Sequence, residues 1–195
     1  MATLITGAGL IGCQTAALLA ARGEPVVLLD LRPDPALIAS VLPLERVTLA
    51  TGDVRDRAAM QALFAQHRIQ AVVHTAAALS IAIRADPALA ADVNFGGTVN
   101  LLEAARATGV RRFLLASSTT VYYPTFHRAW PAPIVEDFAF HAVSERPGSL
   151  YAASKLAAEF FAQHYGDQFG LSVGILRYSA VLGLWAGPNN SVPGR

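Results

Sequence analysis

The sequence predicts an α/β fold in which one doubly wound parallel sheet carries helices on both faces. Short apolar runs of strand length alternate with Ala- and Leu-rich runs of helix length. The strand candidates are continuously apolar, which is typical of strands that are covered on both faces. Regular alternation of β and α elements favours parallel strands joined by right-handed crossovers.

The first part of the chain contains four expected strands and three expected helices. Gly23 and Pro25 follow the first helix, and Pro43 stops the second, as residues that end helices do. The expected strands are Ala2–Thr6, Pro25–Asp30, Arg46–Ala50 and Gln70–Thr75, and the expected helices are Leu10–Arg22, Pro35–Leu42 and Arg57–Gln66.

The second part continues the alternation but contains two segments that do not fit it. The expected elements are a long helix from Pro87 to Ala107 that ends at Gly109, and then strand Val110–Ser117, helix Tyr151–Phe169 and strand Ser172–Arg177. The first irregular segment, 122–148, is long and Pro-rich. Such loops are usually functional, and a plain surface excursion is the alternative. The second, 184–195, is rich in Gly, Pro and Asn.

Composition excludes several classes of protein. The chain has 195 residues, of which 53% are apolar and 15% charged, and a net charge of +1. We therefore expect one sizeable core and no nucleic-acid partner. The single Cys13 fits a reducing compartment. The apolar N-terminus lacks the basic start of a signal peptide, and no apolar run is long enough for a membrane span. We expect a cytoplasmic protein without a membrane partner.

A glycine-rich turn follows the first strand and opens the first helix, with the sequence Thr6-Gly7-Ala8-Gly9-Leu10-Ile11-Gly12. This strand–turn–helix context is the one that a dinucleotide-binding fingerprint requires. Its glycines permit a tight turn and the close approach of a pyrophosphate to the helix N-terminus. Asp30 ends the second strand, where a carboxylate binds ribose hydroxyls and selects NAD over NADP. Arg32 lies two residues on and weakens that preference; an ordinary strand-end cap is the alternative for Asp30.

Two further strand ends carry polar residues. Asp53 and Val54 follow the third strand, where a side chain would lie near an adenine, although a Gly-Asp turn also occurs without a ligand. A hydroxyl cluster that includes Ser117 and Ser118 ends the fifth strand. Ligands of open α/β sheets bind at the carboxyl ends of the strands, so this cluster could hold a substrate oxygen; a merely polar strand end is the alternative.

Tyr151 and Lys155 stand four residues apart in an expected helix and therefore share one face. An unperturbed tyrosine titrates near ~10, and a neighbouring cation lowers that pKa toward the range of a useful base. Lys155 is the only lysine in the chain. We interpret its single use as a need for a compact point charge, against the alternative that the spacing is accidental.

These features, in this order, make the chain resemble the NAD-dependent epimerase/dehydratase family of extended short-chain dehydrogenases/reductases. The resemblance rests on the glycine turn, Asp30, Asp53-Val54, His74 to Ala77, Asn94 to Asn100, Ser117-Ser118, Tyr151 with Lys155, and Leu176-Arg177-Tyr178. It implies a Rossmann-like fold with NAD as the cofactor. It also implies that Ser118, Tyr151 and Lys155 are catalytic. Residues of the cofactor site would be Gly7, Gly9, Leu10, Ile11, Gly12, Asp30, Asp53, Val54, Ala76, Ala77, Asn94, Tyr151, Lys155 and Tyr178.

The chain departs from the family pattern at several positions. The glycine turn is one residue shorter than usual, so the family pattern does not predict its shape. Ser179 and Ala180 replace the Phe-Asn of many sugar-nucleotide members, and Thr119-Thr120 replaces the Asp-Glu of dehydratases, which argues against dehydration. We expect an NAD-binding domain over 1–183, with 184–195 as a tail or the start of a truncated substrate region.

The resemblance leaves the activity open between several alternatives. We expect an NAD-dependent oxidoreductase or epimerase that acts on a hydroxyl-bearing sugar or nucleotide-sugar and forms a homodimer. The alternatives are a simple alcohol or sugar dehydrogenase or reductase, a non-catalytic NAD sensor, and a cofactor-binding fragment without turnover. No histidine spacing suggests a metal site.

Overall fold

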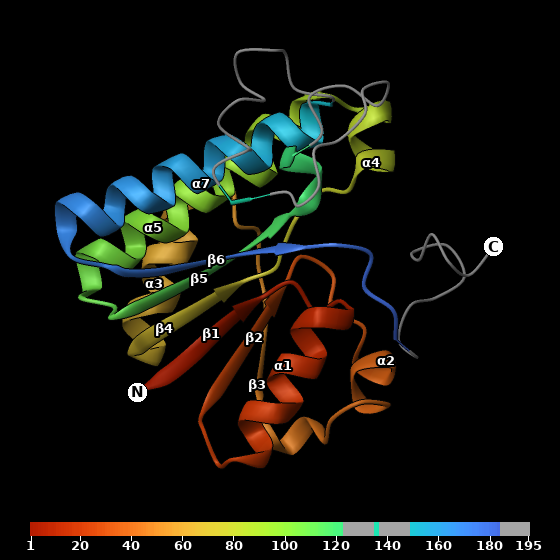
Figure 1. Cartoon of the computed structure of the whole chain (residues 1–195). Coiled ribbons are helices and arrows are strands. Elements are labelled where there is room, and N and C mark those ends of the chain that lie inside the picture. The colour runs from red at the N-terminus through yellow and green to blue at the C-terminus, as the bar shows by residue number, and fades with distance from the viewer. Residues whose placement is uncertain (123–134, 137–148, 184–195) are drawn as a thin grey trace.

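A computed structural model describes residues 1–122, 135–136 and 149–183, which build one six-stranded sheet (Figure 1). Every neighbouring pair of strands is parallel, and the order is β3-β2-β1-β4-β5-β6. The order reverses between β1 and β4, which opens a crevice at the carboxyl ends of these strands. The strands are β1 (Ala2–Thr6), β2 (Val26–Asp30), β3 (Thr48–Thr51), β4 (Ile69–His74), β5 (Arg112–Ser118) and β6 (Ser172–Tyr178).

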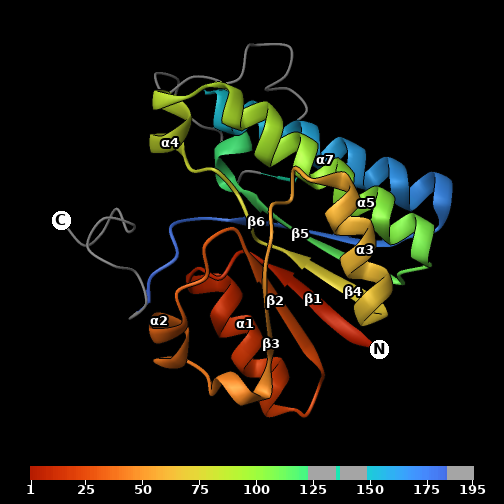
Figure 2. The ribbon, with the colours of Figure 1, turned by 180° about the vertical axis from the view of Figure 1, so that it is seen from behind.

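Helices cover both faces of the sheet, so the predicted doubly wound fold is confirmed. Figures 1 and 2 show α1 (Leu10–Ala21) and α2 (Pro35–Ala39) on one face. The other face carries α3 (Arg57–His67), α5 (Gly97–Thr108) and α7 (Leu150–Phe169). Shorter segments are the 3-10 turns Leu44–Arg46 and Thr119–Tyr122, the helix α4 (Ser80–Ala85) and a π-helical stretch Ala90–Gly96.

The apolar core forms two layers, one on each face of the sheet. Leu4 packs with Phe64 and Phe113 under α3, α5 and α7, whereas its neighbour Ile5 packs with Ile38 under α1 and α2. Successive strand residues point to opposite faces, which explains why the central strands are apolar without interruption. The edge strands β3 and β6 are only partly buried, so the expectation of full coverage is wrong for them.

The expected long helix from Pro87 to Ala107 is confirmed as one continuous helical run from Ala88 to Thr108, but the type of helix differs in its first turns. Residues Ala90–Gly96 are π-helical and α5 begins at Gly97, while α4 was not expected at all. Two tertiary contacts flank this stretch: the Asn94 amide binds the backbone of Ala78, and a Cβ on Gly97 would lie 2.6 Å from Val54 Cγ2. The expected end of the helix is confirmed, because Gly109 has φ +71°.

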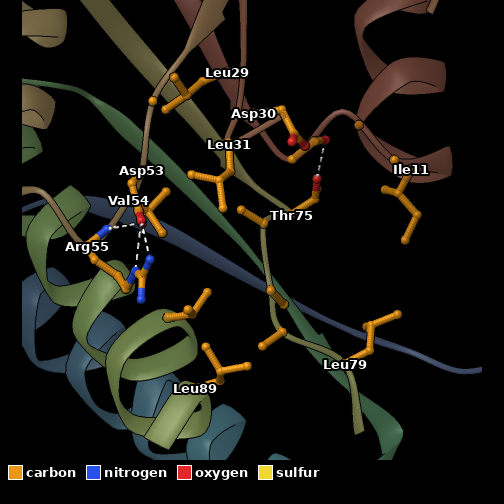
Figure 3. A pocket seen from close by; sticks show the side chains of 18 of the residues that line it. Ile11, Leu29, Asp30, Leu31, Asp53, Val54, Arg55, Thr75, Leu79 and Leu89 are labelled. Atoms are coloured by element: carbon orange, nitrogen blue, oxygen red, sulfur yellow. Dashed lines mark hydrogen bonds and ion pairs between the residues drawn. The ribbon is translucent and has the colours of Figure 1, made fainter. Parts of the chain in front are cut away.

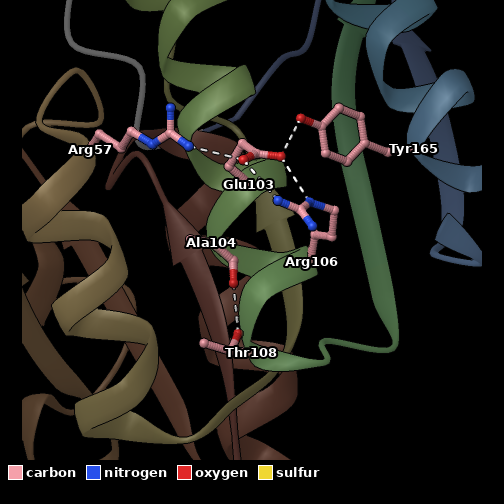
Figure 4. A network of polar contacts seen from close by, with 6 residues as sticks. All are labelled: Arg57, Glu103, Ala104, Arg106, Thr108 and Tyr165. Carbon is pink, nitrogen blue, oxygen red and sulfur yellow. Dashed lines mark hydrogen bonds and ion pairs between the residues drawn. The ribbon is translucent and has the colours of Figure 1, made fainter.

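A carboxylate network joins the three helices of one face (Figure 4). Glu103 of α5 accepts hydrogen bonds from Arg57 of α3 (2.9 Å), from Arg106 (3.0 Å) and from the Tyr165 hydroxyl of α7 (2.6 Å). The Arg106 and Tyr165 donors lower the pKa of Glu103 to about 2. The network therefore holds α3, α5 and α7 together as one layer at neutral pH.

Most of the irregular segments 122–148 and 184–195 lies outside the described residues, so the expectations for them remain predictions. Tyr122, at the start of the first segment, closes the 3-10 turn after β5. Within the part of the chain that is described, no helix combines the length and apolarity that a membrane crossing requires.

Candidate cofactor site and neighbouring hydroxyl cluster

A cavity of about 620 Å³ opens at the carboxyl ends of β1 to β4 (Figure 3). Its size falls within the usual range of small-molecule sites. Ten of the predicted cofactor residues line it: Gly7, Gly9, Leu10, Ile11, Gly12, Asp30, Asp53, Val54, Ala76 and Ala77. Four strand ends that are far apart in the sequence thus meet where the sheet order reverses.

The shortened glycine turn keeps an open helix N-terminus. Gly7 has φ +90°, and a Cβ there would lie 2.7 Å from the Ala76 nitrogen. A Cβ on Gly12 would lie 1.9 Å from the Gly7 oxygen, whereas a Cβ on Gly9 would have no atom within 4 Å. Gly9 caps α1 and faces the cavity. The turn therefore leaves free space beside Gly9 at the N-terminus of α1, which is where a helix can bind an anion.

Asp30 both lines the cavity and holds the turn that forms it. Its Oδ2 accepts a hydrogen bond from the Ala8 nitrogen (2.7 Å), and its Oδ1 accepts one from the Arg32 nitrogen (2.8 Å). The side chain of Arg32 is not part of the cavity wall. The strand-end cap and the functional interpretation of Asp30 are thus compatible, because the carboxylate serves the turn and still faces the cavity.

The arginine in the cavity wall is Arg55, which the sequence analysis missed. It binds Asp53 through Nη2 (2.6 Å) and Nε (2.8 Å), and these bonds lower the pKa of Asp53 (Figure 3). Its proximity to Asp53 in sequence was the available signal. The other lining residues that were missed are mostly small or apolar neighbours of predicted ones: Leu29, Leu31, Gly52, Thr75, Ala78, Leu79, Leu89, Val93 and Val181.

The three predicted catalytic residues lie together beside the carboxyl end of β5, and none is among the residues that line the cavity. The Tyr151 hydroxyl shares a hydrogen bond with Ser118, which is buried. The Lys155 Nζ lies 6.0 Å from the centroid of the Tyr151 ring and donates to the Ala116 oxygen at 2.8 Å. The structure therefore brings a hydroxyl, a phenol and an ammonium group close to one another.

The electrostatic expectation for Tyr151 is wrong in this structure. Burial raises the pKa of the Tyr151 phenol, and the hydrogen bond with Ser118 only opposes that rise. Burial also lowers the pKa of Lys155 to about 8, against the attraction of Glu159. The physical reason is desolvation, which disfavours both charged forms, while the Lys155 ammonium is directed at a backbone carbonyl.

Asn94 and Tyr178 are also absent from the cavity wall. Asn94 is 1% exposed; its Oδ1 accepts from the Ala78 nitrogen (2.7 Å), and its Nδ2 donates to the Ala78 oxygen (3.0 Å) and to Ser154 Oγ (3.1 Å). It therefore fixes the loop after β4 and joins it to α7. Tyr178 lies at the end of β6 in a separate groove that also contains Tyr122.

His74 and Cys13 are both buried in the core. His74 bridges Thr6 (2.6 Å) and Thr98 (3.0 Å), and burial lowers its pKa to about 3. Burial and the Asp30 charge raise the pKa of Cys13 to about 11, so its thiol stays protonated. Among the residues that can be described, no three His, Cys, Asp or Glu side chains gather as metal ligands would.

The sheet order and the glycine turn at its switch point define a Rossmann-like α/β domain. Residues 3–194 match the NAD dependent epimerase/dehydratase family, and the chain belongs to this family. It is 36% identical to a UDP-glucose 4-epimerase of Erwinia amylovora over 85% of this chain and 48% of the relative. It is 34% identical to UDP-glucuronate 4-epimerase 3 of Arabidopsis thaliana, over 95% of this chain and 44% of the relative.

Solved structures show the same fold. A UDP-glucose 4-epimerase of Thermus thermophilus, in complex with NAD, superposes with a TM-score of 0.81 at 32% identity, over 100% of this chain and 60% of that one. A GalE-like L-threonine dehydrogenase from Cupriavidus necator superposes with a TM-score of 0.71 at 27% identity, over 91% of this chain and 55% of that one. The chain thus spans about half the length of the curated relatives it matches.

Proposed function

We propose that this chain binds NAD and supplies the acid/base residues of a sugar-nucleotide epimerase. The cavity supports the cofactor part of the proposal. Gly9 leaves space for a pyrophosphate at the N-terminus of α1, and Asp30 offers acceptors to ribose hydroxyls from the end of β2. Asp53 stands at the end of β3, where the adenine would lie. When bound, NAD supplies the acceptor for a hydride from the substrate carbon.

The observation that carries the catalytic part is the contact between the Tyr151 hydroxyl and Ser118, with Lys155 one helical turn away. Tyr151 exchanges the proton of a substrate hydroxyl, and Ser118 holds the substrate oxygen beside it. Lys155 places a positive charge one helical turn from the phenol and, as the family resemblance implies, would hold the nicotinamide ribose. UDP-sugars are the substrate class because the relatives are named as epimerases of UDP-glucose and UDP-glucuronate.

The cofactor proposal is tested by calorimetric titration of the chain with NAD and NADP. We expect NAD to bind at least tenfold more tightly, because the Asp30 carboxylate would repel a 2′-phosphate. Asp30→Asn should narrow this preference by relieving the repulsion. Equal or tighter binding of NADP by the unmodified chain would refute the role of Asp30 in selecting NAD. It would indicate that Arg55, the arginine in the cavity wall, binds the 2′-phosphate.

The catalytic proposal is tested with Tyr151→Phe in the protein at the length of its relatives. We expect the variant to lose turnover of UDP-glucose while its NAD affinity stays within a few-fold, because Phe removes only the proton-transfer group. Cys13→Ser, at a buried position outside the catalytic cluster, is the control and should retain activity. A Phe variant that keeps most of the rate would exclude Tyr151 as the acid/base.

A dehydrogenase is the second candidate, and the similarity to the L-threonine dehydrogenase structure favours it. The two functions differ in their products. An epimerase inverts the sugar and leaves NAD unchanged after each cycle, whereas a dehydrogenase accumulates NADH. Incubation with UDP-sugars and with threonine, followed by NADH absorbance and sugar chromatography, separates the two.

We also propose that the protein is a homodimer in which α5 and α7 pair with their counterparts. These helices lie side by side on one face (Figure 1), and α7 exposes Leu150, Phe161 and Phe169. Light scattering at micromolar concentration should give twice the mass of one chain. A monomer would contradict the proposal without affecting that for the cofactor.

A further inference from the structure

The helix α7 and the strand β5 are joined by a polar seam that extends beyond the Tyr151–Lys155 pair. Three consecutive strand residues, 116–118, contact three helix residues spaced four apart. The carbonyl of Ala116 accepts from Lys155, the hydroxyl of Ser117 donates to Glu159, and that of Ser118 bonds with Tyr151. Residues four apart share one face of a helix, so Glu159 is the third member of this row.

Glu159 is buried and fully engaged. It is 2% exposed, and besides Ser117 it accepts hydrogen bonds from Arg177 of β6, at 2.7 Å from Nη2 and 3.1 Å from Nε. Arg177 in turn donates to the Tyr122 hydroxyl (2.9 Å) and stacks on that ring at 4.8 Å. A buried ion pair of this kind adds little to the stability of the fold, because the cost of desolvating both charges offsets their attraction. We therefore consider a second role for the pair, which is to support a neighbouring charge.

The neighbouring charge is Lys155, which is 3% exposed. On its own helix it faces the phenol of Tyr151 and the carboxylate of Glu159. From β4 it faces His74, which burial keeps neutral, and from β5 the uncharged carbonyl of Ala116. Arg177 of β6 donates to Glu159, to the Tyr122 hydroxyl and to the backbone oxygen of Glu136. Among these groups, Glu159 is the one carboxylate, and it forms an ion pair with Arg177.

We propose that Glu159 is a positioning residue for Lys155: held by Ser117 and Arg177, its carboxylate keeps the buried ammonium charged and fixes α7 on β5. The inference rests on the proposed function, in which the charge of Lys155 matters. It assigns Glu159 no contact with substrate or cofactor. Glu159 raises the pKa of Lys155 while burial lowers it to about 8, so loss of the carboxylate should release the proton at a lower pH.

The single lysine makes this directly measurable. Chain produced with isotope-labelled lysine gives one side-chain NMR signal, whose titration reports the pKa of Lys155. We expect Glu159→Gln to lower the midpoint by about one pH unit, the lower end of the effect of a close opposite charge. Glu103→Gln, which removes another arginine-bound helix carboxylate from the network in Figure 4, is the matched control and should leave the midpoint unchanged.

In the single variant Glu159→Gln, Arg177 loses its carboxylate partner, and the unpaired buried charge could unfold the protein. The double variant Glu159→Gln/Arg177→Met removes both charges, which is better tolerated than removing one. It should also lower the midpoint, but by less than the single variant, because a neighbouring cation is lost with the carboxylate. A folded variant of either kind with the midpoint of the unmodified chain would overturn the proposal, as would an equal fall in Glu103→Gln.

The titration distinguishes this proposal from the proposed function because it needs neither NAD nor turnover. If the unmodified chain fails to bind NAD but Glu159→Gln shifts the Lys155 midpoint, the proposed function fails and the electrostatic role stands. If NAD binds and its affinity falls with rising pH, that fall should begin at a lower pH in Glu159→Gln. An identical pH dependence in the two proteins would count against the positioning role alone.

Discussion

Two glycines of the same turn should respond in opposite ways to the addition of one methyl group. Gly12→Ala places a Cβ 1.9 Å from the Gly7 oxygen, which is a backbone atom and cannot rotate away. Gly9→Ala places its Cβ in open space at a residue with φ −87°, which alanine adopts without strain. We therefore expect Gly12→Ala to lose stability and Gly9→Ala to retain it.

The magnitudes follow from the contacts. Overpacking typically costs up to about 3 kcal/mol, and the rigid partner places Gly12→Ala near that value. Alanine stabilises a helix by about 1 kcal/mol relative to glycine, which offsets part of the overpacking cost. The net loss in the free energy of unfolding is then about 2 kcal/mol. For a chain of this size that corresponds to a Tm lower by about 4–8 °C. Gly9→Ala should stay within about 0.5 kcal/mol of the unmodified chain.

Ligand binding should show a different pattern. The Cβ of Gly9→Ala would occupy the space that we assign to the pyrophosphate, so NAD affinity should fall at least tenfold, or about 1.4 kcal/mol. Thermal unfolding followed by circular dichroism, with and without NAD, measures both effects. The reasoning is refuted if Gly12→Ala melts with the unmodified chain, or if Gly9→Ala is stable and binds NAD with full affinity.

Two further predictions concern stability. His74 has a folded pKa of about 3, below its ordinary 6.5, so its contribution is complete above pH 6.5 and is lost as pH falls toward 3. Urea unfolding should show a loss of about 2 kcal/mol between pH 7 and pH 5; equal stabilities would contradict a buried neutral imidazole. Tyr165→Phe removes one hydrogen bond to the Glu103 carboxylate and should lower the free energy of unfolding by about 1 kcal/mol. An unchanged urea midpoint would show that this bond does not stabilise the fold.

The sequence by itself determined the elements whose cause is local. The strand Ala2–Thr6 was predicted with its observed bounds because it is a short, largely apolar run that ends at the glycine turn. The ends of α5 and α7 follow from Gly109 and Gly170, which both adopt positive φ. Most of the predicted residues in the cavity wall lie at or just after the end of a strand, and parallel strands bring their carboxyl ends to one edge. Ala76 and Ala77 were implied by the family resemblance.

Tertiary structure decided what depends on partners distant in the chain. The π-helical stretch before α5 contains Asn94, whose side chain binds the backbone of Ala78, and no local sequence pattern predicts that contact. The raised pKa of Tyr151 follows from burial, whereas the spacing to Lys155 suggested the reverse. Glu159 gains its partners from β5 and β6 only when α7 packs on the sheet. Desolvation and long-range contacts are properties of the packed chain, which explains why residue spacing alone could not predict them.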